Sequence, residues 1–231
     1  MNVEVLPDAA AVATRAAQFI AAQARDAVAV RGRFAFAVSG GHTPWLMLKV
    51  LAAEQVPWAS VHLFQVDERI APPGHADRNL THIQESLGTR APLDPDHLHA
   101  MPVEDADLAA AAARYSAQLR TVTGSPPALD LVHLGLGPDG HTASLVPGDP
   151  ALQVVDTDVA LTGVYQGRRR MTLTYPVLDR ARQVLWVVTG AEKVAIVPRL
   201  RAGDTSIPSG HVRPDRALLL LDAAAAGEPV R

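Results

Sequence analysis

The sequence contains no cysteine, and Lys49 and Lys193 are its only lysines. The missing cysteine excludes disulfide bonds, thiolate metal ligands and a cysteine nucleophile. Aromatic residues are also scarce, at 4% of the chain, yet 48% of all residues are apolar, an ordinary proportion for a globular protein. We therefore expect the 231 residues to bury a substantial core and to form a single domain over residues 1–231.

Long apolar runs and long basic runs are missing as well. No uninterrupted apolar stretch approaches the roughly 18 residues that span a membrane, and residues 1–7 lack the pattern of a signal peptide. The formal net charge is −3, and Arg168–Arg170 is the only dense cationic cluster, so non-specific nucleic-acid binding has little support. We expect a cytoplasmic protein with no membrane and no nucleic-acid partner.

Apolar segments of strand length alternate with helical segments along the chain. This alternation is typical of an α/β fold with a mainly parallel sheet and helices on both faces. Strands are expected at Val3–Val5, Phe34–Val38, Val61–Val66, Leu129–Leu134, Val159–Val164, Met171–Thr174, Val184–Thr189 and Ala217–Leu221. We expect the fifth and sixth of these to form a hairpin across the Gln166-Gly167 turn, and a loop to run from Asp67 to about Asp77. Helices are expected from an Asp8 cap to Val30, from Thr43-Pro44 to Ala53, and at Asn79–Leu87, Asp105–Val122 and Ala191–Arg201.

The loop after the Leu129–Leu134 strand is the most informative segment. It is rich in glycine and places Asp139 and His141 two residues apart. In an open α/β sheet, ligands bind beside the loops that follow the carboxyl ends of strands, and glycine lets the backbone approach a ligand closely. A histidine there is suited to act as a general base near neutral pH. We interpret His141 as functional, and His133, within the strand, as a packed residue.

A second strand-end loop is Ser39-Gly40-Gly41-His42-Thr43-Pro44. Backbone amides at the start of a helix form an anion site, to which the hydroxyls of Ser39 and Thr43 add donors. The alternative is a tight turn with a capped helix. The loop lacks the Walker lysine and the dinucleotide glycine pattern, so nucleotide binding is not supported.

Further charged residues follow the Val61–Val66 strand, precede the Met171–Thr174 strand and begin the Ala191–Arg201 helix. Asp67-Glu68-Arg69 could bind sugar hydroxyls and phosphate, but on its own the motif favours surface ion pairs. Arg168–Arg170 and Lys193 have the chemistry to bind phosphate oxygens, although for Arg168 we expect a solvated turn. No metal site is expected, because His97 and His99 have no further ligand at a suitable spacing and no H-E-x-x-H motif occurs.

Three of these motifs together resemble the 6-phosphogluconolactonase family: S-G-G-x-T-P, D-E-R and G-x-G-P-D-G-H-T-A-S-L, in this order. The resemblance extends from about Phe34 to Leu221. It implies a Rossmann-like fold and the hydrolysis of 6-phospho-D-glucono-1,5-lactone to 6-phospho-D-gluconate, in the oxidative pentose phosphate pathway, without metal or organic cofactor. It also implies a catalytic pair, His141 and Asp139, and substrate-binding residues Ser39, Gly40, Gly41, Thr43, Asp67, Arg69, Gly140, Arg170 and Lys193.

The chain departs from the family pattern at two places. His42 stands where a serine is common, and Gln65-Val66 precede the acidic motif where Trp-Gly is frequent. The role of Asp139 stays open between orienting the imidazole and binding a substrate hydroxyl. A nucleophilic Ser144 is the alternative mechanism, but the G-x-S-x-G elbow is absent.

Two alternative functions remain. Glucosamine-6-phosphate deaminase shares the fold and the D-G-H loop, but its usual continuation I-A-F-N-E-P differs from Thr142–Pro147 here, and its D-E-Y differs from Asp67-Glu68-Arg69. A non-catalytic sugar-phosphate sensor would carry a DNA-binding segment, and no helix-turn-helix candidate lies outside the α/β core. We expect a sugar-phosphate lactone as the only partner, and a monomer or weak homodimer.

Overall fold

The computed structural model describes residues 1–88 and 90–228, and its centre is a seven-stranded sheet. Every strand pair in this sheet is parallel, which confirms the expected α/β class. In spatial order the strands are β1 (Asn2–Leu6), β10 (Ala217–Asp222), β9 (Val184–Val188), β6 (Leu131–Leu134), β2 (Phe34–Val38), β3 (Val61–Gln65) and β5 (Leu98–His99).

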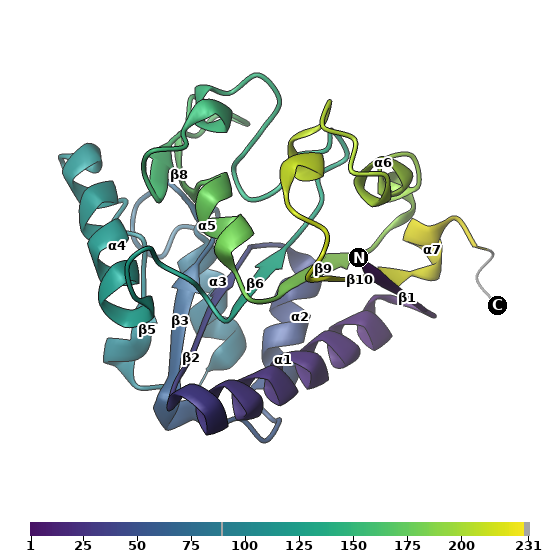
Figure 1. Ribbon diagram of the computed structural model, residues 1–231, viewed down its shortest axis with the longest axis horizontal. Coiled ribbons are helices and arrows are strands. Elements are labelled where there is room, and N and C mark those ends of the chain that lie inside the picture. Colours follow the sequence, from purple (N-terminus) through teal and green to yellow (C-terminus); the bar gives the residue numbers. More distant parts are fainter. Residues whose placement is uncertain (89, 229–231) are drawn as a thin grey trace.

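Helices cover both faces of the sheet, because successive strand residues point to opposite sides. In β2, Phe34 and Phe36 pack with one set of helices, whereas Ala35 and Ala37 belong to the core on the other side. Helix α1 lies along the face opposite to α5 and β8 (Figure 1). One face carries α1 (Ala9–Arg31), α2 (His42–Leu51) and α3 (Asn79–Leu87), and the other carries α4 (Leu108–Thr123), α5 (Tyr175–Arg180) and α6 (Val197–Arg201).

A second, three-stranded antiparallel sheet lies on the α4–α5 side. It consists of β4 (Asp67–Arg69), β8 (Arg170–Leu173) and β7 (Val159–Leu161). The sequence predicted a loop for Asp67-Glu68-Arg69, and this was wrong: the segment pairs with β8. The predicted hairpin is confirmed, and its turn residues Gln166 and Gly167 both have positive φ, at 49° and 76°. Two such residues are typical of a type I′ hairpin turn.

Two helix predictions need correction. Helix α2 begins at His42 with Gly41 as its N-cap, and the Thr43 hydroxyl contacts the hydroxyl of Thr189 instead of capping. The predicted helix Ala191–Arg201 is divided into a 3₁₀ turn, Ala191–Lys193, and α6. Proline has no N–H for an i→i−4 hydrogen bond, so Pro198 is accommodated only in the first turn of a new helix.

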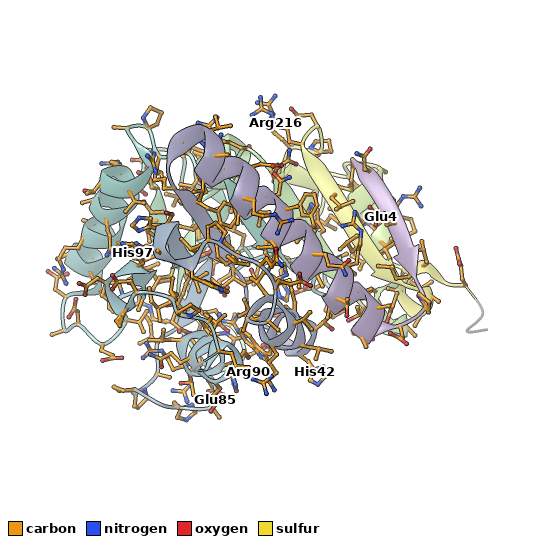
Figure 2. All side chains as sticks on the ribbon, turned by 90° about the horizontal axis from the view of Figure 1, so that it is seen from below. Glu4, His42, Glu85, Arg90, His97 and Arg216 are labelled. Atoms are coloured by element: carbon orange, nitrogen blue, oxygen red, sulfur yellow. The ribbon has the colours of Figure 1, made fainter. Side chains whose placement is uncertain are left out.

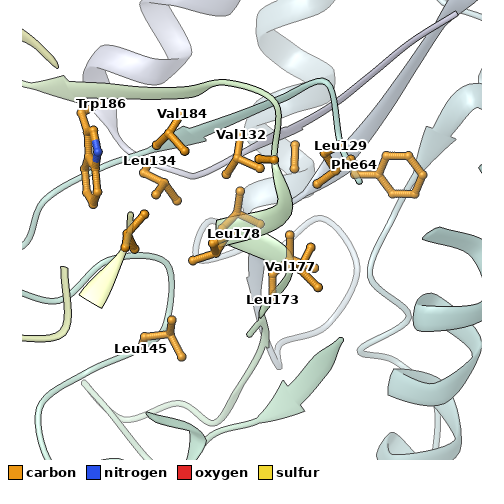
Figure 3. Close-up of a cluster of buried hydrophobic side chains, with 14 of the residues drawn as sticks. Phe64, Leu129, Val132, Leu134, Leu145, Leu173, Val177, Leu178, Val184 and Trp186 are labelled. Atoms are coloured by element: carbon orange, nitrogen blue, oxygen red, sulfur yellow. The ribbon is translucent and has the colours of Figure 1, made fainter. Parts of the chain in front are cut away.

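The core on the α5 side joins both sheets. Figure 3 shows Val132 and Trp186 of the parallel sheet facing Leu173 of β8 and Leu178 of α5. Labelled charged residues such as Glu85 and Arg216 lie at the periphery (Figure 2). The small sheet is therefore held against the large one by apolar packing, which fixes the strand-end loops of both.

The strand order creates a crevice between β2 and β6. From β2 the chain continues to β3 and β5 on one side, and from β6 it continues to β9 and β10 on the other. Such a reversal separates the loops that follow the two central strands and is where ligands bind in open α/β sheets. The loops that begin at Ser39 and Gly135 leave the sheet at this point.

Candidate active site

A cavity of about 320 Å³ lies at this crevice. It is lined by the loops after β2, β6 and β9 together with residues of the small sheet. Of the predicted site residues, those that line it are Ser39, Gly40, Gly41, Thr43, Asp67, Arg69, His141, Arg170 and Lys193; Asp139 and Gly140 do not.

Asp139 lies behind His141 and binds it directly. The distance from His141 Nδ1 to Asp139 Oδ1 is 2.6 Å, and the His141 amide donates to the same oxygen at 3.1 Å. A carboxylate only accepts hydrogen bonds, so Nδ1 carries the proton and Nε2 is the nitrogen left to accept one. Burial raises the pKa of Asp139, but hydrogen bonds from His141 and Tyr165 and the His141 charge outweigh it and leave the pKa below its ordinary value.

Two glycines shape this loop. A Cβ atom on Gly137 would lie 2.1 Å from His141 Nδ1 and 2.7 Å from Asp139 Oδ1, so the pair fits only against a bare backbone. Gly140 has φ of 84°, and its Cβ would meet Ile207 at 2.6 Å. The Gly140 amide donates to the Gly137 carbonyl and its own carbonyl accepts from the Ser209 amide. Gly140 therefore lies in the turn and does not line the cavity, although the family resemblance implies that it binds substrate.

The acidic motif is buried, which corrects the preference for surface ion pairs. Asp67 lines the cavity, and its Oδ2 accepts a hydrogen bond of 2.6 Å from the hydroxyl of Ser144. Glu68 is fully buried and accepts from the first amides of α3, at Asn79 and Leu80. Ser144 is fully buried too and does not line the cavity, a position that argues against its use as a nucleophile.

Asn79 is the first residue of α3, and its side-chain amide donates to the Asp67 carbonyl at 2.9 Å. A Cβ on Gly40 would lie 2.0 Å from Asn79 Oδ1. The loop after β2 therefore packs directly on the start of α3. This contact requires glycine at position 40.

Three cations face the cavity: Arg69, Arg170 and Lys193. Within residues 1–88 and 90–228, the Nε atoms of Arg69 and Arg170 are buried without a hydrogen-bond partner. Burial lowers the pKa of Arg170. Of the three consecutive arginines, it is Arg170 that points inward, whereas Arg168 pairs with Asp77 at 2.9 Å and is not a freely solvated turn residue.

The loop after β2 supplies donors from its backbone and from Ser39. Four amides at the start of a helix have no intrahelical partner, and the first turn of α2 contributes His42 and Thr43 to the cavity wall. The Ser39 hydroxyl is buried and has no partner among the described residues. The Ser39 amide donates to Nδ1 of the buried His133 at 3.2 Å, so His133 fixes the start of this loop.

Sequence reasoning missed Tyr165, which lies in the hairpin turn between β7 and β8. Its hydroxyl donates to Asp139 Oδ2 at 3.1 Å. Burial beside Asp139 raises the pKa of Tyr165. No local sequence motif predicts Tyr165 as a site residue, because it reaches the Asp139–His141 pair only through the pairing of β8 with β4. Thr189 and Glu192 also line the cavity and were not predicted.

Two general features complete the description. In the described part of the chain, no three His, Asp or Glu side chains are grouped closely enough to hold a metal ion. Among the same residues, no helix is both long and apolar enough to cross a bilayer.

Comparison with known proteins identifies the class to which this fold and cavity belong. The family model described as "Glucosamine-6-phosphate isomerases/6-phosphogluconolactonase" matches residues 7–221, and the chain belongs to this family. A 6-phosphogluconolactonase of Nostoc sp. is 40% identical over 98% of both chains. A 6-phosphogluconolactonase of Synechocystis sp. is 34% identical over 100% of this chain and 98% of its own.

Solved structures agree with this assignment. The 6-phosphogluconolactonase of Thermotoga maritima superimposes with a TM-score of 0.85 at 26% identity, over 96% of this chain and 98% of the other. A monomeric glucosamine-6-phosphate deaminase superimposes with a TM-score of 0.86 at 15% identity, which shows that it shares the fold. The Rossmann-like fold that the family resemblance implied is thereby confirmed.

Proposed function

We propose that the chain is a 6-phosphogluconolactonase, which hydrolyses 6-phospho-D-glucono-1,5-lactone to 6-phospho-D-gluconate in the cytoplasm as part of the oxidative pentose phosphate pathway. Its full-length similarity to proteins of that name supports the substrate. The observation that carries the chemistry is the Asp139–His141 pair beside a cavity lined by Arg69, Arg170 and Lys193.

His141 acts as the general base in this proposal. Because Asp139 holds Nδ1–H, Nε2 is free to remove a proton from the water molecule that attacks C1 of the lactone. The imidazolium that forms beside the carboxylate then gives its proton to the ring oxygen as the bond from C1 to that oxygen breaks. Asp139 orients the imidazole and stabilises its charge, since its carboxylate already accepts from His141 and Tyr165.

The cations hold the other end of the substrate. Arginine forks and a lysine ammonium suit phosphate oxygens, and the buried Nε atoms of Arg69 and Arg170 are donors that a bound anion can satisfy. The first amides of α2 add further donors. Anchoring the phosphate places C1 near His141 and makes the attack effectively intramolecular.

The proposed reaction uses neither a metal ion nor an organic cofactor. The lactone also hydrolyses unaided, so the enzyme needs only a modest share of the rate enhancement typical of enzymes. A positioned base of this kind contributes roughly 10²- to 10⁴-fold, which suffices for that share.

The test is hydrolysis of freshly generated lactone, followed by acid release with the spontaneous rate subtracted. We expect acceleration that persists in EDTA. Loss in EDTA with recovery on adding a divalent ion would refute the metal-free mechanism. Ammonia release from glucosamine 6-phosphate, assayed in parallel, would identify a deaminase instead. Binding of the lactone's product without turnover of either substrate would indicate a sensor.

Sedimentation would test the expected monomer or weak homodimer.

A further inference from the structure

The hairpin turn between β7 and β8 is held rigidly next to the site. The amides of Tyr165 and Arg168 each donate to the other residue's carbonyl, at 2.9 and 3.2 Å, and thus close the turn around Gln166 and Gly167. With positive φ at both central residues, this turn matches the twist of the paired strands. The position of Tyr165 is therefore fixed by the hairpin itself.

The same turn is tied to the segment that precedes α3. Arg168 Nε donates to Asp77 Oδ2 at 2.9 Å, and Arg168 Nη2 lies 3.3 Å from His75 Nε2. The hydrogen bond from Arg168 lowers the pKa of Asp77 below its ordinary value. Two connections, one through β8 and one through Asp77, thus hold the turn in place over the loop of His141.

From this turn Tyr165 contacts three groups of the proposed reaction. Its hydroxyl donates to Asp139 Oδ2 at 3.1 Å, and its ring meets the His141 ring nearly edge-on, with 5.5 Å between centroids and 67° between planes. The Arg170 guanidinium lies over the Tyr165 ring face at 5.0 Å. Gln166 accepts a hydrogen bond from Arg170 Nη2 at 3.2 Å. Tyr165 does not itself line the cavity.

The two oxygens of Asp139 have different partners as a result. Oδ1 faces His141, and Oδ2 faces the phenol hydroxyl. Both hydrogen bonds from His141, from Nδ1 and from the backbone amide, reach Oδ1, and without Tyr165 the other oxygen of this broadly rotating carboxylate has no hydrogen bond to restrain it. A second bond on the other oxygen holds Oδ1 in line with Nδ1 and keeps the imidazole in one orientation.

We propose that Tyr165 is a positioning residue for lactone hydrolysis, which fixes the Asp139–His141 pair through its hydroxyl and Arg170 through its ring. The inference rests on the proposed function of that site. It predicts that the two parts of one side chain affect different kinetic constants. The hydroxyl governs kcat because it acts on the base, and the ring also governs KM because it supports a substrate-binding arginine.

Two variants separate these parts. Tyr165→Phe keeps the ring and removes the hydroxyl, and we expect kcat to fall about three- to tenfold with KM nearly unchanged. Tyr165→Leu removes the ring as well, and we expect a similar loss of kcat together with a rise of KM. Tyr175→Phe is the matched control, because it also removes a phenol hydroxyl, one that donates to the Pro208 carbonyl at 2.8 Å.

The pH–rate profile separates positioning from simple loss of structure. The hydrogen bond from Tyr165 helps to keep the pKa of Asp139 low, so its removal raises that pKa. Without the phenol donor the carboxylate accepts more strongly from His141 Nδ1–H and stabilises the protonated imidazole, so the acid limb of the profile in Tyr165→Phe, which reports protonation of the base, moves to higher pH. Unchanged kcat and an unchanged acid limb in a folded Tyr165→Phe protein would overturn the inference.

A measurement without substrate keeps this inference distinct from the proposed function. The Nδ1–H resonance of His141, assigned by its loss in His141→Ala, should shift in Tyr165→Phe and stay in place in Tyr175→Phe. If the wild type fails to hydrolyse the lactone but this shift is seen, the proposed function fails and the positioning of the pair stands. If the wild type is active and the resonance does not move, Tyr165 does not position the pair.

Discussion

Strand β6 and the loop that follows it each contain a histidine, and the protein uses the two in different ways. His133 lies in the middle of the sheet, is fully buried, and accepts a hydrogen bond from the Ser39 amide. Burial lowers its pKa to about 3, so it stays neutral. His141 lies beyond the end of the strand, lines the cavity and binds a carboxylate. The same residue type is structural inside the sheet and suited to acid–base chemistry at its edge.

The largest effect should come from replacing His141, the histidine at the edge of the sheet. We expect His141→Ala to lower kcat by roughly 10²- to 10⁴-fold, the usual contribution of a positioned base, with little change in thermal stability. Steady-state kinetics on the lactone measure this, with the exposed His211→Ala as control. Full turnover in His141→Ala would break the contrast between the two histidines.

The edge pair also depends on the bare backbone beneath it. Gly137→Ala would place a Cβ 2.1 Å from His141 Nδ1, so we expect kcat to fall about tenfold or more as the pair is displaced. Gly135→Ala is the matched substitution in the same loop, because its Cβ meets no atom within 4 Å. Equal kinetics of the two variants would show that His141 is not held in the position described here.

The cations at the edge should affect binding more than turnover. Lys193 and Arg170 both line the cavity, so replacing either by alanine should raise KM roughly tenfold with a smaller effect on kcat, since each contributes a charge-assisted hydrogen bond to phosphate. Initial rates over a range of lactone concentrations separate the two constants. An unchanged KM in both variants would rule out this phosphate pocket.

The buried histidine should have the smallest effect on activity, and its replacement is seen in stability instead. Burial holds the folded-state pKa of His133 at about 3, below the ordinary histidine value of 6.5, so the unfolded chain binds more protons between these two pH values. The free energy of unfolding therefore carries no penalty from His133 above about pH 6.5, and it falls as the pH drops from 6.5 toward 3. His133→Asn, which retains an acceptor for Ser39, should remove up to about 1.4 kcal/mol per pH unit from this slope. Thermal unfolding at several pH values measures it; parallel curves would contradict the proposed neutral state.

Much of the fold could be predicted because periodic apolar patterns and capping residues are local signals. The Asp8 side chain caps α1 as expected, and the buried strand Phe34–Val38 was placed with its observed bounds. The strand Asp67–Arg69 was missed because its pairing partner, β8, lies far along the chain. Polar residues in a short strand look like a loop until that partner is known.

The candidate site shows the same difference between local signals, which the sequence contains, and long-range contacts, which it does not reveal. Glycine-rich strand ends identified the loops that meet at the cavity, since they depend on local sequence and on the parallel sheet. Tyr165 was missed, and the burial of Glu68 was not anticipated, because both result from contacts between the two sheets. The choice among Arg168, Arg169 and Arg170 likewise required the register of β8, in which Arg170 lies opposite Arg69.

The exposed hairpin turn beside Tyr165 offers a practical handle. Val164 is 72% exposed in that turn, and the chain has no thiol of its own. A single cysteine at position 164 could therefore carry a fluorophore or spin label without background reaction. Such a probe would report, in real time and without a coupled assay, whether the turn changes its surroundings when a sugar phosphate enters the crevice.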